Sequence, residues 1–139
     1  EIDRYCKEKG IGWFASVWDK DSVDFMSNYT NISKIPSALI TDYDLCRYSR
    51  NNFDTLLIST GMSDQREVDL AIHNANPDVV FHTNSTYPSP ISELNLNYIH
   101  WLKSDGNANI CSSCSWCNLD RKTCYPRQNN VGIRSFSVS

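Results

Sequence analysis

The sequence predicts an α/β protein that forms part of a TIM (β/α)8 barrel, with about four βα units. Short apolar, β-rich runs alternate with amphipathic segments, and successive runs begin about 20–24 residues apart. That period is typical of parallel βα units joined by short loops. The runs are almost continuously apolar, as expected for strands that are buried on both faces.

Four runs are expected to form strands, and the segment after each is expected to form a helix. A further helix is expected before the first strand. The expected strands are 12–18, 32–36, 55–60 and 79–83, and the expected helices are 1–10, 19–26, 41–51, 63–76 and 89–104. Thr41 and Ser63 are the predicted N-caps, because a hydroxyl there can accept a hydrogen bond from a first-turn amide. Pro90 lies near the first position of the last helix, where proline is favoured.

The positions of polar residues distinguish a TIM barrel from a doubly wound sheet. Every expected strand carries or precedes polar residues near its carboxyl end: Ser16, then Lys34 and Ser37, then Ser59 and Thr60, then 83–87. A TIM barrel builds its site from the ends of all its strands, whereas a doubly wound sheet concentrates the site at one switch point. The distribution favours the barrel. A whole barrel needs roughly 250 residues, so we expect this chain to supply only part of one.

Composition excludes several classes of function. The net charge is −3, which gives no basic footprint for nucleic acid. No run of 18 apolar residues is present, so no membrane partner is expected. Two of the 6 cysteines lie in residues 1–104 and the others in 105–139. A disulfide-stapled secreted domain would distribute them more evenly, so a reducing, cytoplasmic location is predicted.

Lys34 is the most informative single residue in the apolar runs. It lies inside ISKIPS, where a buried ammonium is costly unless it is paired or functional. It could be a surface lysine at a strand edge marked by Pro36, or an ammonium aimed at an anionic ligand beside Ser37. The stretch from Ser59 to Gly61 could be a simple turn, or could bring helix amides to an anion. His82 fits a packing histidine better than a ligand.

Four cysteines near the carboxyl end suggest a metal site. Cys111, Cys114, Cys117 and Cys124 have the spacing C-x2-C-x2-C-x6-C, which leaves a zinc-binding module as one alternative. The last gap is short for a zinc ribbon, and no second pair of cysteines accompanies it.

Four segments together resemble a known family. FASVWD, KIPSALIT, LLISTGMS and FHTNSTYPSP occur in this order, and their combination resembles the sialic acid synthase family over about residues 1–103. This family comprises the N-acetylneuraminate synthases and the related legionaminic and pseudaminic acid synthases. The resemblance implies a cytoplasmic, homodimeric TIM-barrel transferase of carbohydrate biosynthesis. It would condense phosphoenolpyruvate with an N-acetylmannosamine-type sugar, using Mn²⁺ or Mg²⁺, and release phosphate. Another phosphoenolpyruvate- and aldehyde-condensing barrel enzyme is the alternative.

The resemblance also implies roles for individual residues. Lys34 and Tyr87 would be catalytic, with Tyr87 bordering the sugar, and the phosphoenolpyruvate-binding set would be Ser16, Lys34, Ser37, Ser59 and Ser85. Chemistry agrees, because a trianionic substrate favours an ammonium with converging hydroxyl and amide donors. Two departures are present: Leu39 stands where some members have an acidic residue, and Ser16 stands where many have threonine.

The composition changes abruptly after residue 104, and no helix or strand pattern fits 105–139. The family segment with the metal-binding histidines is missing there. Residues 110–135 can be back-translated with allowed codons so that the frame starting at the second base reads FAAVVLGATWIERHVTLDRTMWGSDH, which resembles that segment. The pair Trp116–Cys117 forces a glycine in this frame. We therefore expect a partial synthase domain at 1–104 and a frameshifted, non-native tail at 105–139, in which Thr123 overlaps the codon of the metal histidine. The chain as it stands is expected to be inactive and to bind no metal.

Overall fold

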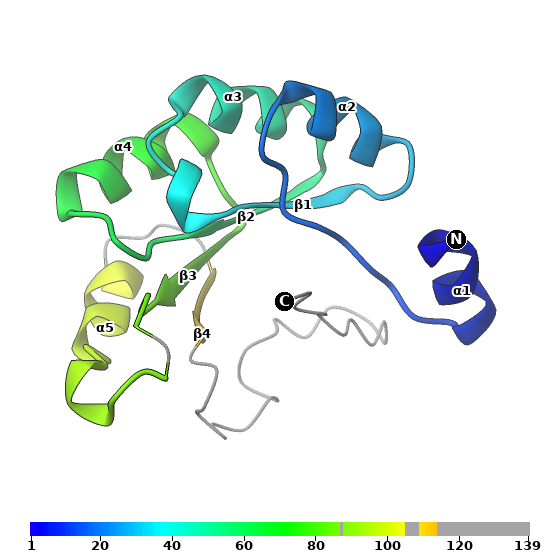
Figure 1. The fold of residues 1–139 in the computed structure, drawn as a ribbon. Helices are drawn as coiled ribbons and strands as arrows, with labels where there is room; N and C mark the ends of the chain where they lie inside the picture. Colours follow the sequence, from blue (N-terminus) through cyan, green and yellow to red (C-terminus); the bar gives the residue numbers. More distant parts are fainter. Residues whose placement is uncertain (87, 105–108, 114–139) are drawn as a thin grey trace.

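Four parallel strands form the centre of the molecule. The computed structural model describes residues 1–86, 88–104 and 109–113. The strands are β1 (Ile32–Ile35), β2 (Thr55–Ser59), β3 (Val79–Thr83) and β4 (Asn109–Ser113), in the order β1-β2-β3-β4 (Figure 1). Every neighbouring pair is parallel. Because chain order equals spatial order, each connection moves the chain one strand along the sheet, as in a barrel wall. The predicted α/β class is confirmed.

Three helices cover one face of this sheet. They are α2 (Lys20–Ser27), α3 (Tyr43–Asn52) and α4 (Gln65–Ala75), which lie side by side along the sheet (Figure 1). The helix α5 (Asn97–Ser104) follows β3, and α1 (Ile2–Lys9) lies apart from the other helices. Two short 3-10 turns, η1 (Ser37–Leu39) and η2 (Ile91–Glu93), lie in the connections after β1 and β3. In the described ranges, no helix is long and apolar enough to cross a membrane.

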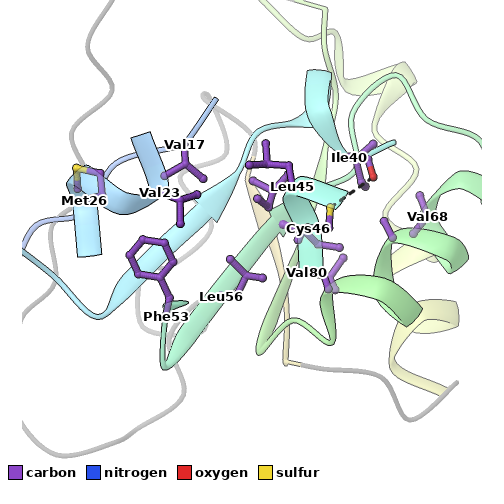
Figure 2. Packing of buried hydrophobic residues seen from close by; sticks show 14 of the residues in the cluster. Val17, Val23, Met26, Ile40, Leu45, Cys46, Phe53, Leu56, Val68 and Val80 are labelled. Atoms are coloured by element: carbon purple, nitrogen blue, oxygen red, sulfur yellow. Dashed lines mark hydrogen bonds between the residues drawn. The ribbon is translucent and has the colours of Figure 1, made fainter. Parts of the chain in front are cut away.

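The core lies between the sheet and the helices. Strand register places Ile35, Ile58 and Val80 side by side, and all three are fully buried. They belong to the same cluster as Leu45 and Cys46 of α3, whose packing is seen in Figure 2. Side chains alternate between the two faces of a strand. The opposite face, here called the inner face, therefore carries Lys34, Leu57 and Val79 in one row and Ser59 and Phe81 in the next.

The first expected strand is wrong as predicted. Residues 12–18 do not form a strand, although Gly12 and Ser16 each take part in an isolated bridge, that of Ser16 being parallel to Lys34. The Val17 amide donates to the Lys34 carbonyl over 3.1 Å. Beyond it, the Trp18 and Asp19 amides both donate to the Ser22 hydroxyl, at 2.9 and 3.0 Å. The chain therefore turns into α2 directly after the run, with Asp19 as the N-cap, and the Trp18 and Asp19 amides do not extend the β ladder.

The two predicted N-caps are each displaced by one residue. Asp42, not Thr41, accepts from the Leu45 amide at 2.9 Å and caps α3. Asp64, not Ser63, forms a reciprocal capping box with Glu67, in which both hydrogen bonds are 2.9 Å. A carboxylate accepts a charge-assisted hydrogen bond and also interacts favourably with the positive end of a helix. An aspartate next to a hydroxyl residue therefore takes the cap.

Two further expectations are corrected at the carboxyl side. Segment 89–104 is not one helix but η2 followed by α5, with Leu94 between them in an extended conformation. The expectation that no strand fits 105–139 is wrong for β4, which pairs with β3 over its whole length. A short segment beside an open parallel edge can form a ladder through its backbone, which sequence patterns do not register.

An ion pair between Arg50 and Asp78, here called the clip, links α3 to the end of the sheet opposite to the polar strand ends. Arg50 at the end of α3 contacts the Asp78 carboxylate over 2.7 Å, and the same Asp78 oxygen accepts from the Leu56 amide at 2.7 Å. Arg50 also donates to the Phe53 and Asp54 carbonyls. Burial alone raises the pKa of Asp78, but the Leu56 amide and Arg50 outweigh it and hold the pKa below the usual 3.8.

Asp78→Asn is expected to lower the free energy of unfolding by about 1 kcal/mol at neutral pH, a value discounted for the exposure of the pair. Because the pKa of Asp78 is lower in the folded chain, its carboxylate stabilises the fold at pH values above the usual pKa. This stabilisation is lost as the pH falls through the lower pKa of the folded state. The difference between the two proteins should therefore shrink below about pH 4. Urea unfolding at several pH values measures this, with Asp69→Asn on the surface of α4 as the control. Equal stability of Asp78→Asn and the unaltered chain at neutral pH would contradict the role of the clip.

Candidate active site at the strand ends

Three connections meet at the carboxyl edge of the sheet. Ser37 follows β1 and opens η1, Gly61 follows β2, and Thr83 is the last residue of β3. The carboxyl ends of parallel strands lie along the same edge, so these residues are neighbours although they are far apart in the sequence. Thr60 fastens β2 to β3 there, because its amide and its hydroxyl both donate to the Phe81 carbonyl, at 3.0 and 3.1 Å.

A cluster of hydroxyl groups surrounds Gly61. The Gly61 amide donates to the Ser37 hydroxyl over 3.0 Å, and this oxygen lies 3.3 Å from the Thr83 hydroxyl oxygen. A Cβ atom on Gly61 would lie 2.6 Å from the Ser85 hydroxyl oxygen, 2.9 Å from that of Thr83 and 3.0 Å from that of Ser37. We call Ser37, Thr83 and Ser85 the hydroxyl cluster. Only glycine allows the three hydroxyls to approach this close to the backbone.

The inner face adds a cation and two more hydroxyl residues. Ser16 and Lys34 are bridge partners, so their side chains leave the same face, and Ser59 lies one row closer to the carboxyl edge. Lys34 therefore has the Ser16 segment on one side and β2 on the other. Since β1 is the end strand of the sheet and the contact with Ser16 is an isolated bridge, the interpretation of Lys34 as an edge lysine stays open.

Lys34 is a half-buried cation without a counter-ion in the described part of the chain. None of the ion pairs between described residues includes it. Burial lowers the pKa of Lys34 below the usual 10.5, because the charged form loses hydration. An anionic ligand on the inner face would supply the missing counter-charge.

Ser59 is the second group that a ligand would satisfy. The residue is 2% exposed, and its hydroxyl oxygen has no hydrogen-bond partner among the described residues. A buried hydroxyl that is left unpaired costs about 1–3 kcal/mol. Its position one row from Lys34 places both residues on the inner face near the carboxyl edge.

The amino end of α4 does not provide the expected anion site. The Glu67 amide already donates to the Asp64 carboxylate, and the Asp64 amide donates to the Glu67 carboxylate. An anion there would face the Asp64 carboxylate.

In the loop between β2 and α4, Met62 has φ 62, the left-handed conformation that is costly for a residue with a side chain. Backbone strain of this kind tends to be retained near functional sites.

Other candidates lie outside the site or outside the described residues. Tyr87 is not among the described residues, so its predicted place beside the sugar stays a prediction. His82 points to the face opposite to Lys34 and packs against the Tyr98 ring, with centroids 5.2 Å apart. Burial lowers the pKa of His82. These contacts agree with a packing role for His82.

Two cysteines of the described region, Cys6 and Cys46, are packing residues. Cys6 and Cys46 are free and buried, and burial together with the nearby Asp42 charge raises the pKa of Cys46 to about 11. The described residues contain no group of three or more His, Cys, Asp or Glu that could hold a metal ion. The run from Cys114 to Cys124 lies outside the described residues, so the zinc-site hypothesis stays untested.

Sequence reasoning assigned roles to Lys34, Ser37, Ser59 and Ser85. It counted Thr83 among the polar residues at the strand ends but gave it no role, and it missed the steric role of Gly61. The contact between Ser37 and Thr83 joins residues 46 positions apart, across β2, which lies between their strands. It depends on the register of three strands, which periodicity does not reveal. The one available signal was a glycine directly after an apolar strand run, where a close backbone approach is common.

Comparison with solved structures defines the class of fold. An N-acetylneuraminic acid (sialic acid) synthetase from Leptospira borgpetersenii matches 80% of this chain and 41% of its own, with a TM-score of 0.75 and 23% identity. A spore coat polysaccharide biosynthesis protein from Bacillus subtilis matches 78% of this chain with a TM-score of 0.71. The described sheet and helices are therefore part of a TIM barrel, as predicted.

The family follows from the sequence. The model of the NeuB family matches residues 1–113, and the chain belongs to this family. Among its relatives are a pseudaminic acid synthase from Campylobacter jejuni, 29% identical over 79% of this chain, and an N,N'-diacetyllegionaminic acid synthase from Legionella pneumophila, 30% identical over 75%. The chain covers 34% and 32% of these relatives. It thus spans about a third of their length. The predicted resemblance to sialic acid synthases is confirmed.

Proposed function

We propose that the strand ends bind phosphoenolpyruvate in a synthase that joins it to an N-acetylmannosamine-type sugar. The observation that carries the proposal is the convergence of the hydroxyl cluster on Gly61, with Lys34 and the unpaired Ser59 on the adjoining inner face. Family membership and the relatives named as pseudaminic and legionaminic acid synthases support this class of substrate. A phosphorylated carboxylate requires a cation and several donors directed at its oxygens.

Each residue has a defined task in this proposal. Lys34 would neutralise the anion, Ser16, Ser37, Ser59 and Ser85 would donate hydrogen bonds to phosphate or carboxylate oxygens, and Tyr87 would border the sugar. In the reaction, the methylene carbon of phosphoenolpyruvate forms a bond to the sugar aldehyde carbon, and the aldehyde oxygen takes up a proton. Water adds at the enol carbon and phosphate leaves. Donors aimed at the phosphate stabilise the charge that it retains on leaving.

The described residues do not provide a metal centre. The resemblance implies Mn²⁺ or Mg²⁺, which would polarise the aldehyde, but no described group of side chains suits either ion. We therefore assign the described residues to the phosphoenolpyruvate half of the site and derive no metal-dependent step from them. The chain should bind phosphoenolpyruvate without releasing phosphate when an N-acetylated hexosamine is added.

The missing metal half has an explanation in the tail. We infer that residues from about 105 onward are read in a shifted frame, because residues 110–135 admit codons whose next frame resembles the family segment with its histidines. The family match extends to residue 113 and so includes the first residues of this segment. Phosphoenolpyruvate-condensing activity would then belong to the frame in which the histidines are encoded.

Sequencing the coding DNA tests the inferred frameshift. We expect the frame that starts at the second base of the Ile110 codon to encode an IERH-like segment, whose histidine codon overlaps Thr123. If no frame of that DNA encodes such a segment, the inference is wrong. Correcting the frame should then give phosphate release that depends on an N-acetylated hexosamine. Release that depends on a different aldehyde would favour another condensing barrel enzyme.

A further inference from the structure

We propose that Thr83 is a positioning residue that aims the Ser37 hydroxyl hydrogen at the bound anion. This inference rests on the proposed function, since it concerns the same site, but it assigns a task to a residue for which the sequence analysis proposed none. It starts from the two contacts of the Ser37 oxygen, 3.0 Å from the Gly61 amide nitrogen and 3.3 Å from the Thr83 hydroxyl oxygen.

The hydrogen-bond capacity of a serine hydroxyl decides the direction of its proton. A hydroxyl has one hydrogen to donate and two lone pairs that accept. The Gly61 amide can only donate, so it occupies one lone pair of Ser37. If Thr83 donates to the second lone pair, the Ser37 hydrogen has no acceptor within the cluster and is directed to a ligand. An anion offers acceptors only, so this is the arrangement that binding favours.

Thr83 is well suited to hold this arrangement. Its branched Cβ restricts the side chain to few rotamers, and its residue ends β3 in register with Ser113 of β4. The neighbouring Thr60 fastens the end of β2 to the Phe81 carbonyl. The backbone of Thr83 is therefore paired with β4, and pairing of its strand with β2 continues to Phe81, two residues before it. A serine at position 37 without this neighbour could rotate its hydroxyl hydrogen toward other acceptors and lose part of its preference for the anion.

A double-mutant cycle on the full chain separates positioning from a general structural effect. Phosphoenolpyruvate binding is measured by NMR titration, which also detects weak binding, for the unaltered chain, Thr83→Val, Ser37→Ala and the double variant. Loss of one aligned hydrogen bond should raise the dissociation constant about tenfold in Thr83→Val. In the Ser37→Ala background the same change should have almost no effect, because Thr83 acts through Ser37.

Two further variants complete the test. Thr83→Ser keeps the hydroxyl and should bind nearly as tightly as the unaltered chain. Thr55→Val removes a threonine hydroxyl at the opposite end of β2 and should leave binding unchanged. If Thr83→Val binds as tightly as the unaltered chain, or weakens binding equally with and without Ser37, the positioning role is overturned while the phosphoenolpyruvate site stands. If the unaltered chain does not bind phosphoenolpyruvate, the proposed function itself fails, and this inference fails with it.

Discussion

Replacement of Gly61 by alanine is expected to abolish measurable phosphoenolpyruvate binding. The added Cβ would lie 2.6 Å from the Ser85 hydroxyl oxygen and 2.9 Å from that of Thr83, closer than carbon and oxygen approach without a bond. The hydroxyl cluster would have to open, and overpacking of this kind costs about 1–3 kcal/mol. Isothermal titration and thermal unfolding measure the two effects. Both should be large, because one methyl group displaces several ligand donors at once.

Gly10→Ala is the matched control. Gly10 ends α1 with φ 64, and no atom lies within 4 Å of a Cβ placed there. Alanine should therefore destabilise the left-handed backbone by about 1 kcal/mol and leave binding unchanged. Undiminished binding by Gly61→Ala would show that the hydroxyl cluster is not part of the anion site.

Lys34→Met is expected to weaken phosphoenolpyruvate binding by about 10- to 100-fold, since hydrogen bonds to charged groups contribute roughly 1.5–3 kcal/mol. The same substitution should raise the thermal stability of the ligand-free chain at neutral pH. Lys34 is half-buried and lacks a counter-ion among the described residues, and burial lowers its pKa. Methionine removes the charge and keeps most of the packing volume. A gain in stability that accompanies a loss of binding distinguishes a ligand-binding lysine from a structural one.

The pH dependence of stability gives an independent check. Because the folded pKa of Lys34 is lower than its unfolded value, the unaltered chain should gain stability as pH rises from the lowered folded value toward the usual 10.5. Lys34→Met lacks this gain, so the two curves should converge at high pH. Lys9→Met, at an exposed lysine of α1, serves as the control for removing a charge. A loss of stability in Lys34→Met at neutral pH would contradict the account.

The fold could be predicted from sequence where local pattern and burial agree. The apolar runs of β2 and β3 and the amphipathic periods of α3 and α4 gave elements within a few residues of those observed. The failures have local physical causes. At the end of the run 12–18, the Trp18 amide and the following Asp19 amide donate to the Ser22 hydroxyl and not to a neighbouring strand. The helix caps moved to Asp42 and Asp64 because a carboxylate competes better than an adjacent hydroxyl for the same amides.

The site could be predicted in part. Lys34, with Ser37 beside it, was accessible because a charge in an apolar strand is unusual, and the family resemblance gave Ser59 and Ser85 their roles. The contact between Ser37 and Thr83 was not accessible, since it arises from strand register. In the sequence Gly61 resembles an ordinary turn residue, but in the structure three hydroxyl oxygens surround the position that its Cβ atom would take.

Backbone NMR of the isotope-labelled chain shows whether phosphoenolpyruvate binds at the strand ends. Phosphoenolpyruvate is titrated into the full chain while the amide signals of Lys34, Ser59 and Gly61 are followed. The account predicts saturable shifts at these three amides, with the Gly61 signal moving because its hydrogen bond to Ser37 changes when Ser37 engages the ligand. The Lys34→Met variant should require much more ligand for the same change. No shift at these amides, or shifts confined to the opposite end of the sheet near Asp78, would contradict it.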